Sequence, residues 1–271
     1  MIVLAVAATY RVWAEIALIA YRDSQQSHIF LVPIVVAWLV WVRHERFAQC
    51  RRKGTLLGPL VVIAGWLMML GGPHYQIEAA VHLGAVLVVT GCLLAVLGWE
   101  VLQKYLPAFI ALAFLVPVPG IIRQKMGLPI QIFTANGTYA MFDLLGIPVE
   151  RAGYVLSING VQVSIVRAIN GMKMVCALGI VSYAFAFGTP LRGYVRALIL
   201  LLFPVSAVAC NVGRMVPTVW LYGYGPKPLA NLVAATSGWV MVLLAFGLLL
   251  GIIRLLRWAT IPISNYTLAY D

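Results

Sequence analysis

The sequence predicts an all-α polytopic membrane protein of about eight transmembrane helices, with a small extracytoplasmic β-hairpin before the sixth. Composition predicts this class: 63% of the 271 residues are apolar, only 10% are charged, and the mean hydropathy is +0.97. Soluble domains average about 45–50% apolar and about 25% charged residues, which excludes a water-soluble globule. Apolar runs also recur at lengths near the ~20 residues that cross a bilayer. No repeat or second domain interrupts residues 1–271, so we expect a single transmembrane domain.

Eight apolar segments are candidate spans. They cover residues 2–20, 29–42, 56–72, 79–98, 106–120, 170–187, 195–221 and 231–253. The first contains Arg11 and Glu15, whose i, i+4 spacing puts them on one helix face, where we expect them to pair. A paired charge inside a bilayer costs much less than a lone one.

The basic residues predict the orientation. They follow the second, sixth and eighth spans, as Arg43, Arg46, Arg51, Arg52 and Lys53, then Arg192 and Arg196, then Arg254 and Arg257. The opposite loops, 21–28, 73–78 and 222–230, carry only two bases, Arg22 and Lys227. The positive-inside rule then places both termini in the cytoplasm and the protein in the cell's inner (plasma) membrane. The formal charge of +11 belongs to these loops and to lipid headgroups, so we expect no nucleic-acid partner.

Segment 120–169 is the one long stretch that is not a simple span. Residues 128–145 are amphipathic and are expected either to lie along the outer interface or to dip into the membrane and return. Gly146-Ile147-Pro148 then breaks any helix. In 154–165, two alternating β-branched runs flank Asn159-Gly160, which is the strongest short signal for a hairpin.

Polar residues at membrane depth are the candidate functional groups. Arg214 lies about two turns inside the outer end of the seventh span, with Asn211 one turn away on the same face. Two interpretations stay open: a snorkelling arginine, or a cation for a carbonyl or carboxylate in an outward-facing cavity. Lys173 opens the sixth span after Asn170 and is expected to bind there or to snorkel to the interface.

Cysteines and histidines give no motif for metal binding or for a disulfide framework. The four cysteines lie in or beside apolar segments without CxxC spacing, and no histidine pair has ligand spacing. We therefore expect no metal and no cofactor other than bound lipid. Cys176 lies in a run of Met, Val, Ala and Leu, where an apolar environment makes a thiol inert.

Taken in order, several short stretches resemble the exosortase/archaeosortase family. They are Asp23–Pro33 (an acid, then Ser-His, then Leu-x-Pro), Phe114–Gly120, Leu144–Val149, Asn211-x-x-Arg214, Gly225-Pro226 and Ser237-Gly238-Trp239. The resemblance implies a multi-spanning enzyme that cleaves a C-terminal sorting tail from exported proteins and transfers them onward. It also implies an active site of a cysteine in Ala-Cys-Ser-Gly-x-Arg, a later arginine, and a histidine shortly before Gly-Trp.

Two of these three catalytic positions are changed in this chain. By position, Ile169 replaces the cysteine and Ala234 replaces the histidine, while Lys173 stands for the motif arginine and Arg214 for the later arginine. Isoleucine cannot attack a carbonyl, so the covalent route is lost. The resemblance thus implies a catalytically inactive member that serves as a binding or structural subunit. Its partners are expected to be transmembrane helices of other proteins, a larger membrane complex, or lipids.

Two alternatives from other classes remain. The first is an active cysteine peptidase or transpeptidase with Cys176 as a substitute nucleophile, seven residues beyond Ile169 and about 10.5 Å deeper by the helical rise. The second is a small-molecule transporter, which the sequence favours less because it lacks paired broken half-helices in matching repeats.

Overall fold

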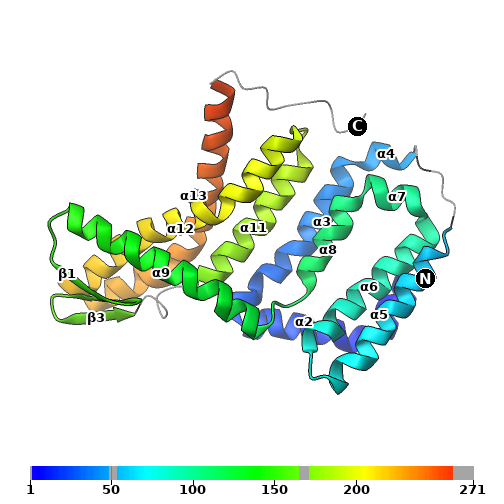
Figure 1. Cartoon of the computed structure of the whole chain (residues 1–271), viewed down its shortest axis with the longest axis horizontal. Coiled ribbons are helices and arrows are strands. Elements are labelled where there is room, and N and C mark those ends of the chain that lie inside the picture. The colour runs from blue at the N-terminus through cyan, green and yellow to red at the C-terminus, as the bar shows by residue number, and fades with distance from the viewer. Residues whose placement is uncertain (1, 49, 51–53, 165–170, 259–271) are drawn as a thin grey trace. The chain divides into compact units, whose positions relative to one another are not determined.

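The computed structural model (Figure 1) describes residues 2–48, 50, 54–164 and 171–258. The chain divides into two compact units. One contains the residues up to Pro119 together with Tyr183–Leu191, and the other contains Gly120–Ser182 and the residues from Arg192 onward. The expectation of a single domain stays a prediction.

The first unit is helical throughout its described residues. Its elements are α1 (Ile2–Ala8), α2 (Tyr10–Arg22), η1 (Ser24–Phe30), α3 (Leu31–Val42), α4 (His44–Ala48), α5 (Leu57–His74), α6 (Glu78–Leu97), α7 (Trp99–Lys104), α8 (Leu106–Leu112) and η2 (Ala113–Leu115). The second unit adds a small sheet. Its elements are α9 (Gly120–Leu144), β1 (Val149–Ala152), β2 (Val155–Ile158), β3 (Val161–Ser164), the greater part of α11 (Gly171–Gly188), α12 (Gly193–Tyr224) and α13 (Lys227–Trp258).

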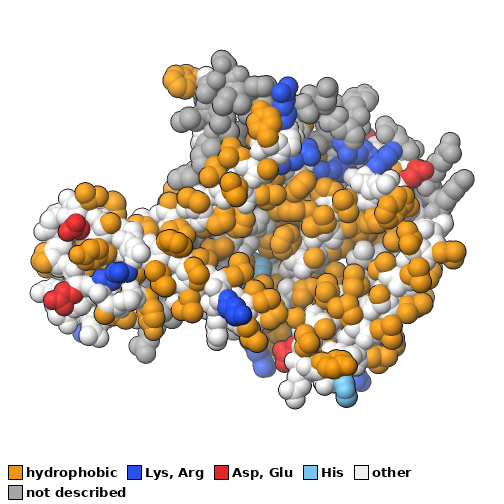
Figure 2. All heavy atoms as spheres, in the orientation of Figure 1, with side chains coloured by type: hydrophobic (Ala, Val, Ile, Leu, Met, Phe, Trp, Pro, Cys, Tyr) orange, Lys and Arg blue, Asp and Glu red, His pale blue; other side chains and the backbone are white. Residues whose placement is uncertain are grey.

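Several of these helices are long and apolar enough to cross a membrane. Over the described residues they are Gln25–Val42, Leu57–His74, Glu78–Leu97 and Gly193–Tyr224, and a fifth if α8–η2 and α9 together count as one bent span. The first four match the second, third, fourth and seventh predicted spans. Hydrophobic side chains cover the flanks of the helices in Figure 2, and on α5 Leu60, Leu67 and Leu70 are each about 60% exposed. An all-α membrane protein therefore fits the structure, because such faces are stable against lipid rather than water.

The predicted first span is interrupted. The helix breaks at Thr9, and α2 is amphipathic, with Val12, Ile16 and Ala20 buried along one face. The expected pairing of Arg11 with Glu15 is wrong. The Glu15 carboxylate instead lies 3.7 Å from Nε2 of His82 on α6, and Arg11 Nε donates to the Tyr10 hydroxyl at 3.3 Å. Two charges on one helix face do not pair when each finds a partner elsewhere.

The predicted fifth span is shorter than expected. The helical turns that begin at Leu106 end at Leu115, and the next helix, α9, begins only at Gly120. Pro117 and Pro119 account for the break, because proline lacks an N–H donor and disfavours the helical conformation in the residue before it. The segment expected to be interfacial or re-entrant is consequently the C-terminal part of a continuous 25-residue helix.

Close backbone contact joins α5 to α6. Three buried glycines, Gly58, Gly65 and Gly72, recur every seven residues along α5. A Cβ atom at Gly58 would lie 2.3 Å from the Ala95 nitrogen, and one at Gly65 would lie 2.6 Å from the Gly84 oxygen. Only glycine leaves room for such an approach, as at other membrane helix interfaces with small residues.

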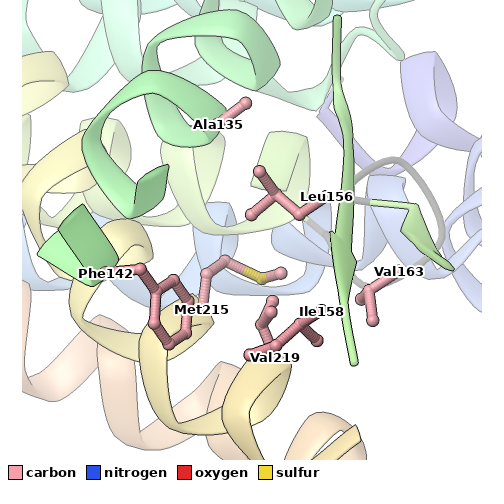
Figure 3. Packing of buried hydrophobic residues seen from close by; sticks show 7 residues of the cluster. All are labelled: Ala135, Phe142, Leu156, Ile158, Val163, Met215 and Val219. Carbon is pink, nitrogen blue, oxygen red and sulfur yellow. The ribbon is translucent and has the colours of Figure 1, made fainter. Parts of the chain in front are cut away.

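The predicted hairpin is present as β2 and β3, which pair antiparallel from Val155–Ser164 to Ile158–Val161. Asn159 and Gly160 both have positive φ, at 49° and 74°, as a two-residue type I′ turn requires. A third strand, β1, pairs with β2 on its other edge. Alternate residues of the sheet, Leu156, Ile158 and Val163, are buried against α9 and α12, as Figure 3 shows.

Candidate functional site

The interface between α9 and α12 contains Asn211 and Arg214, the candidate functional residues predicted from the sequence. On α9, Thr134, Ala135, Thr138 and Phe142 are buried, at the i, i+4, i+8 spacing of one helix face. The buried face of α12 includes Cys210, Asn211, Arg214, Met215, Thr218 and Val219. A Cβ atom at Gly137 would lie only 2.7 Å from Val212 Cγ2, so the two helices pack closely here.

A polar layer of five side chains runs through this interface. Its members, all at most 4% exposed, are Thr134, Thr138, Asn211, Arg214 and Thr218. Arg214 Nη2 donates to Asn211 Oδ1 at 3.1 Å, and Asn211 Nδ2 donates to the Thr134 hydroxyl oxygen at 3.0 Å. The amide thus connects the cation of α12 to the hydroxyl of α9. We call this chain of hydrogen bonds the α9–α12 polar layer.

Two further threonines complete the layer by bonding within their own helices. The Thr138 hydroxyl donates to the carbonyl of Thr134, and the Thr218 hydroxyl donates to the carbonyl of Arg214, each at 2.8 Å. A buried hydroxyl thereby satisfies its donor without leaving its helix. The guanidinium is planar with its donors in fixed directions, so the bond to Asn211 orients it.

Packed apolar residues lie directly beside the polar layer. Phe142 of α9 and Met215 and Val219 of α12 point toward Leu156 and Ile158 of β2 (Figure 3). All five side chains are fully buried. The sheet therefore covers this part of the helix pair, and it holds α9 and α12 together through side chains that water does not reach.

Cys176 is placed away from the hydrogen bonds of the layer. It lies on α11 between two described neighbours, Val175 and Ala177, that are buried. In the described part of the chain, no histidine or carboxylate hydrogen-bonds to its thiol. The structure thus supplies no general base for Cys176 and does not join it to Asn211.

The remaining predicted positions are only partly described. Ile169 and Asn170 lie outside the described residues, and for Lys173 only its place in the first turn of α11 is described. Ala234 lies half-buried on α13, two turns from its start. Cys210 is buried in a small cluster with Val175, Leu178 and Ala207. Within the described ranges, no three His, Cys, Asp or Glu side chains come together as a metal site would require.

A second hollow in this unit is polar. It measures about 550 Å³ and lies where the sheet meets the ends of α9 and α12. Its polar side chains are Tyr139, Asp143, Glu150, Ser157, Asn159 and Tyr224. Asn159 also donates to the carbonyl of Gly223 at 3.0 Å, which fixes the hairpin turn against α12.

Sequence reasoning identified Asn211 and Arg214 but not their partners on α9. Thr134 and Thr138 are separated by four residues, which is the spacing of one helix face, and that was the available signal. Knowing that this face meets α12 requires the tertiary fold.

The family model of the transmembrane exosortases matches residues 13–251 of the chain. The match includes both helices of the polar layer, α9 and α12, and the sheet that packs against them. Neither a curated protein nor a solved structure matches the chain.

Proposed function

The chain belongs to the transmembrane exosortase family, and from this premise we propose that it is a catalytically inactive member acting as a binding or structural subunit of a membrane protein complex. The observation that carries the proposal is the replacement of two catalytic groups. Ile169 stands where the family resemblance expects the cysteine nucleophile, and Ala234 where it expects the histidine. Neither side chain can form a covalent bond to a carbonyl or accept a proton.

The retained arginine supports binding rather than turnover. Arg214 lies buried in the α9–α12 polar layer and donates to Asn211, which in turn donates to Thr134. A guanidinium held in this way is oriented toward an acceptor oxygen, such as the carbonyl or carboxylate of a partner helix. We assign Asn170 and Lys173 to the same proposed binding site. Asn170 directly precedes α11, and Lys173 lies in its first turn.

The proposed topology has eight crossings in the cell's inner membrane with both termini in the cytoplasm. The basic segment 43–53 lies on the cytoplasmic side, and the sheet and the site around Arg214 face the extracytoplasmic side. The partners we propose are transmembrane helices of other proteins, together with lipids.

The decisive experiment is a cleavage assay in liposomes. The wild-type protein is reconstituted with exported proteins that carry a C-terminal sorting tail, and an active exosortase serves as the positive control. We expect no cleavage product from the wild type. Cleavage that a thiol reagent blocks would refute the proposal. A double variant, Ile169→Cys with Ala234→His, tests directly whether the two missing groups account for the absence of cleavage.

Subunit character is measured separately by gentle extraction from the native membrane and mass determination of the intact particle. We expect a stoichiometric complex. A monodisperse, lone chain would contradict a subunit role.

The second candidate is an active peptidase or transpeptidase that uses Cys176. The observation that favours it is the position of Cys176 on α11, seven residues beyond Ile169. It predicts that Cys176→Ala abolishes a cleavage activity measurable in the wild type, whereas Cys210→Ala leaves that activity unchanged.

A further inference from the structure

An apolar groove lies in the first unit, far in sequence from the site around Arg214. It measures about 400 Å³, within the size range of pockets for small molecules. Its walls are aliphatic side chains of α3, α6 and α8, among them Val36, Val40, Leu93 and Leu112. Val40 is 43% exposed, so the groove opens on the surface of the unit.

Basic residues lie near one end of the groove. His44 and Phe47 of α4 line it together with Tyr105, whose hydroxyl donates to the carbonyl of Arg43 at 2.6 Å. Burial raises the pKa of Tyr105, which therefore stays neutral, and Arg43 and Arg46 are the cations whose fields reach its hydroxyl. Lys and Arg side chains gather beside α4 in Figure 2.

Charge and aromatic residues mark this end as the level of lipid headgroups. The described charged residues here are the bases Arg43, Arg46 and Lys104 and the acids Glu45 and Glu100. Trp41 and Trp99 are exposed, at 69% and 47%. Exposed tryptophans beside clustered bases are typical of the interface between membrane and cytoplasm.

We propose that this groove binds one acyl chain of an anionic phospholipid, with the phosphate against the bases of α4. The lining of the groove is apolar, which suits an acyl chain, and Arg46 of α4 lies near the end marked by Tyr105, where it can contact a phosphate. It is too small for a partner helix, because a cylinder 10 Å across fills roughly 420 Å³ in a single turn. The proposal is independent of the function proposed above, since no groove residue belongs to the α9–α12 polar layer.

The first test measures lipid retention by native mass spectrometry of the full chain. The protein is titrated with palmitoyl-oleoyl phosphatidylglycerol or with phosphatidylcholine of the same chains. We expect preferential retention of phosphatidylglycerol. Arg46→Gln should weaken its retention about fivefold, as the loss of one base at a membrane surface does, while Arg22→Gln on α2 should leave it unchanged. Equal retention of the two lipids by the wild type overturns the proposal.

The second test locates the acyl chain. Val40→Trp fills the groove and should reduce retention of phosphatidylglycerol. The control is Ile34→Trp on the same helix: Ile34 is 65% exposed and lies outside the groove, so its replacement should leave retention unchanged. The wild type gives a readout that needs no substitution: phosphatidylglycerol with a diazirine on its acyl chain should cross-link to α3, α6 or α8 residues of the groove. Cross-links confined to other helices overturn the proposal.

Discussion

Removing hydrogen bonds of the α9–α12 polar layer should lower the free energy of unfolding, because one of these bonds joins the two helices. Thr134→Val removes the hydroxyl that accepts from Asn211 while keeping the side chain's shape. Interhelical hydrogen bonds in membrane proteins contribute about 0.6 kcal/mol on average and at most about 1.7 kcal/mol. Asn211→Leu removes this bond and also the one from Arg214, for which a charged donor adds about 1.5–3 kcal/mol. We therefore expect a loss of about 2–4 kcal/mol from the second variant.

The assay is a double-mutant cycle on the free energy of unfolding, measured by circular dichroism as sodium dodecyl sulfate is titrated into mixed micelles. The double variant Thr134→Val with Asn211→Leu should show a coupling energy of about 0.6–1.7 kcal/mol, because both changes remove one shared bond. Thr236→Val is the control: that exposed hydroxyl bonds only to the Leu232 carbonyl of its own helix, and its loss should change stability by less than about 0.5 kcal/mol. Purely additive effects of the two variants would refute the hydrogen bond between Asn211 and Thr134.

Five glycine substitutions test helix packing and the hairpin turn by the same unfolding titration. Gly137→Ala should cost about 1–3 kcal/mol because its Cβ would overlap α12, whereas Gly213→Ala has open space and should gain about 0.5–1 kcal/mol from helix propensity. Gly58→Ala should cost more than Gly71→Ala, because the first Cβ would meet backbone atoms of α6 and the second meets nothing within 4 Å; equal effects would contradict the close α5–α6 approach. Gly160→Ala should cost about 1–2 kcal/mol at its φ of 74°, and an unchanged midpoint would argue against the type I′ turn.

The sequence was sufficient to predict four of the helices that are long enough to cross a membrane, and the hairpin. Apolar runs determine where a membrane helix lies, so α5 and α6 begin and end within two residues of their predicted bounds. Asn159-Gly160 specifies its turn locally, so β2 and β3 were also predictable. The strand β1 was not, because its three exposed residues Glu150–Ala152 show no alternation and gain strand structure only by pairing with β2.

Tertiary contacts explain the other differences. The pairing of Glu15 with His82 depends on α2 packing beside α6, which no local spacing encodes. The same holds for the polar layer. The spacing of Asn211 and Arg214 placed them on one face, and the structure puts their side chains 3.1 Å apart. Their shared link to Thr134 arises only where two helices distant in sequence meet, and the functional roles of all three stay predictions.

The tight pair α5–α6 also bears on how the chain is made. Its glycine contacts join residues that are separated by a short turn at Tyr75–Ile77, so they close soon after both helices have been synthesised. Each helix is long and apolar enough to cross the bilayer, and a hairpin of this kind enters the membrane as one piece. The pair α5–α6 is therefore held together by contacts between residues close in sequence, and none of those contacts involves a residue of the candidate site.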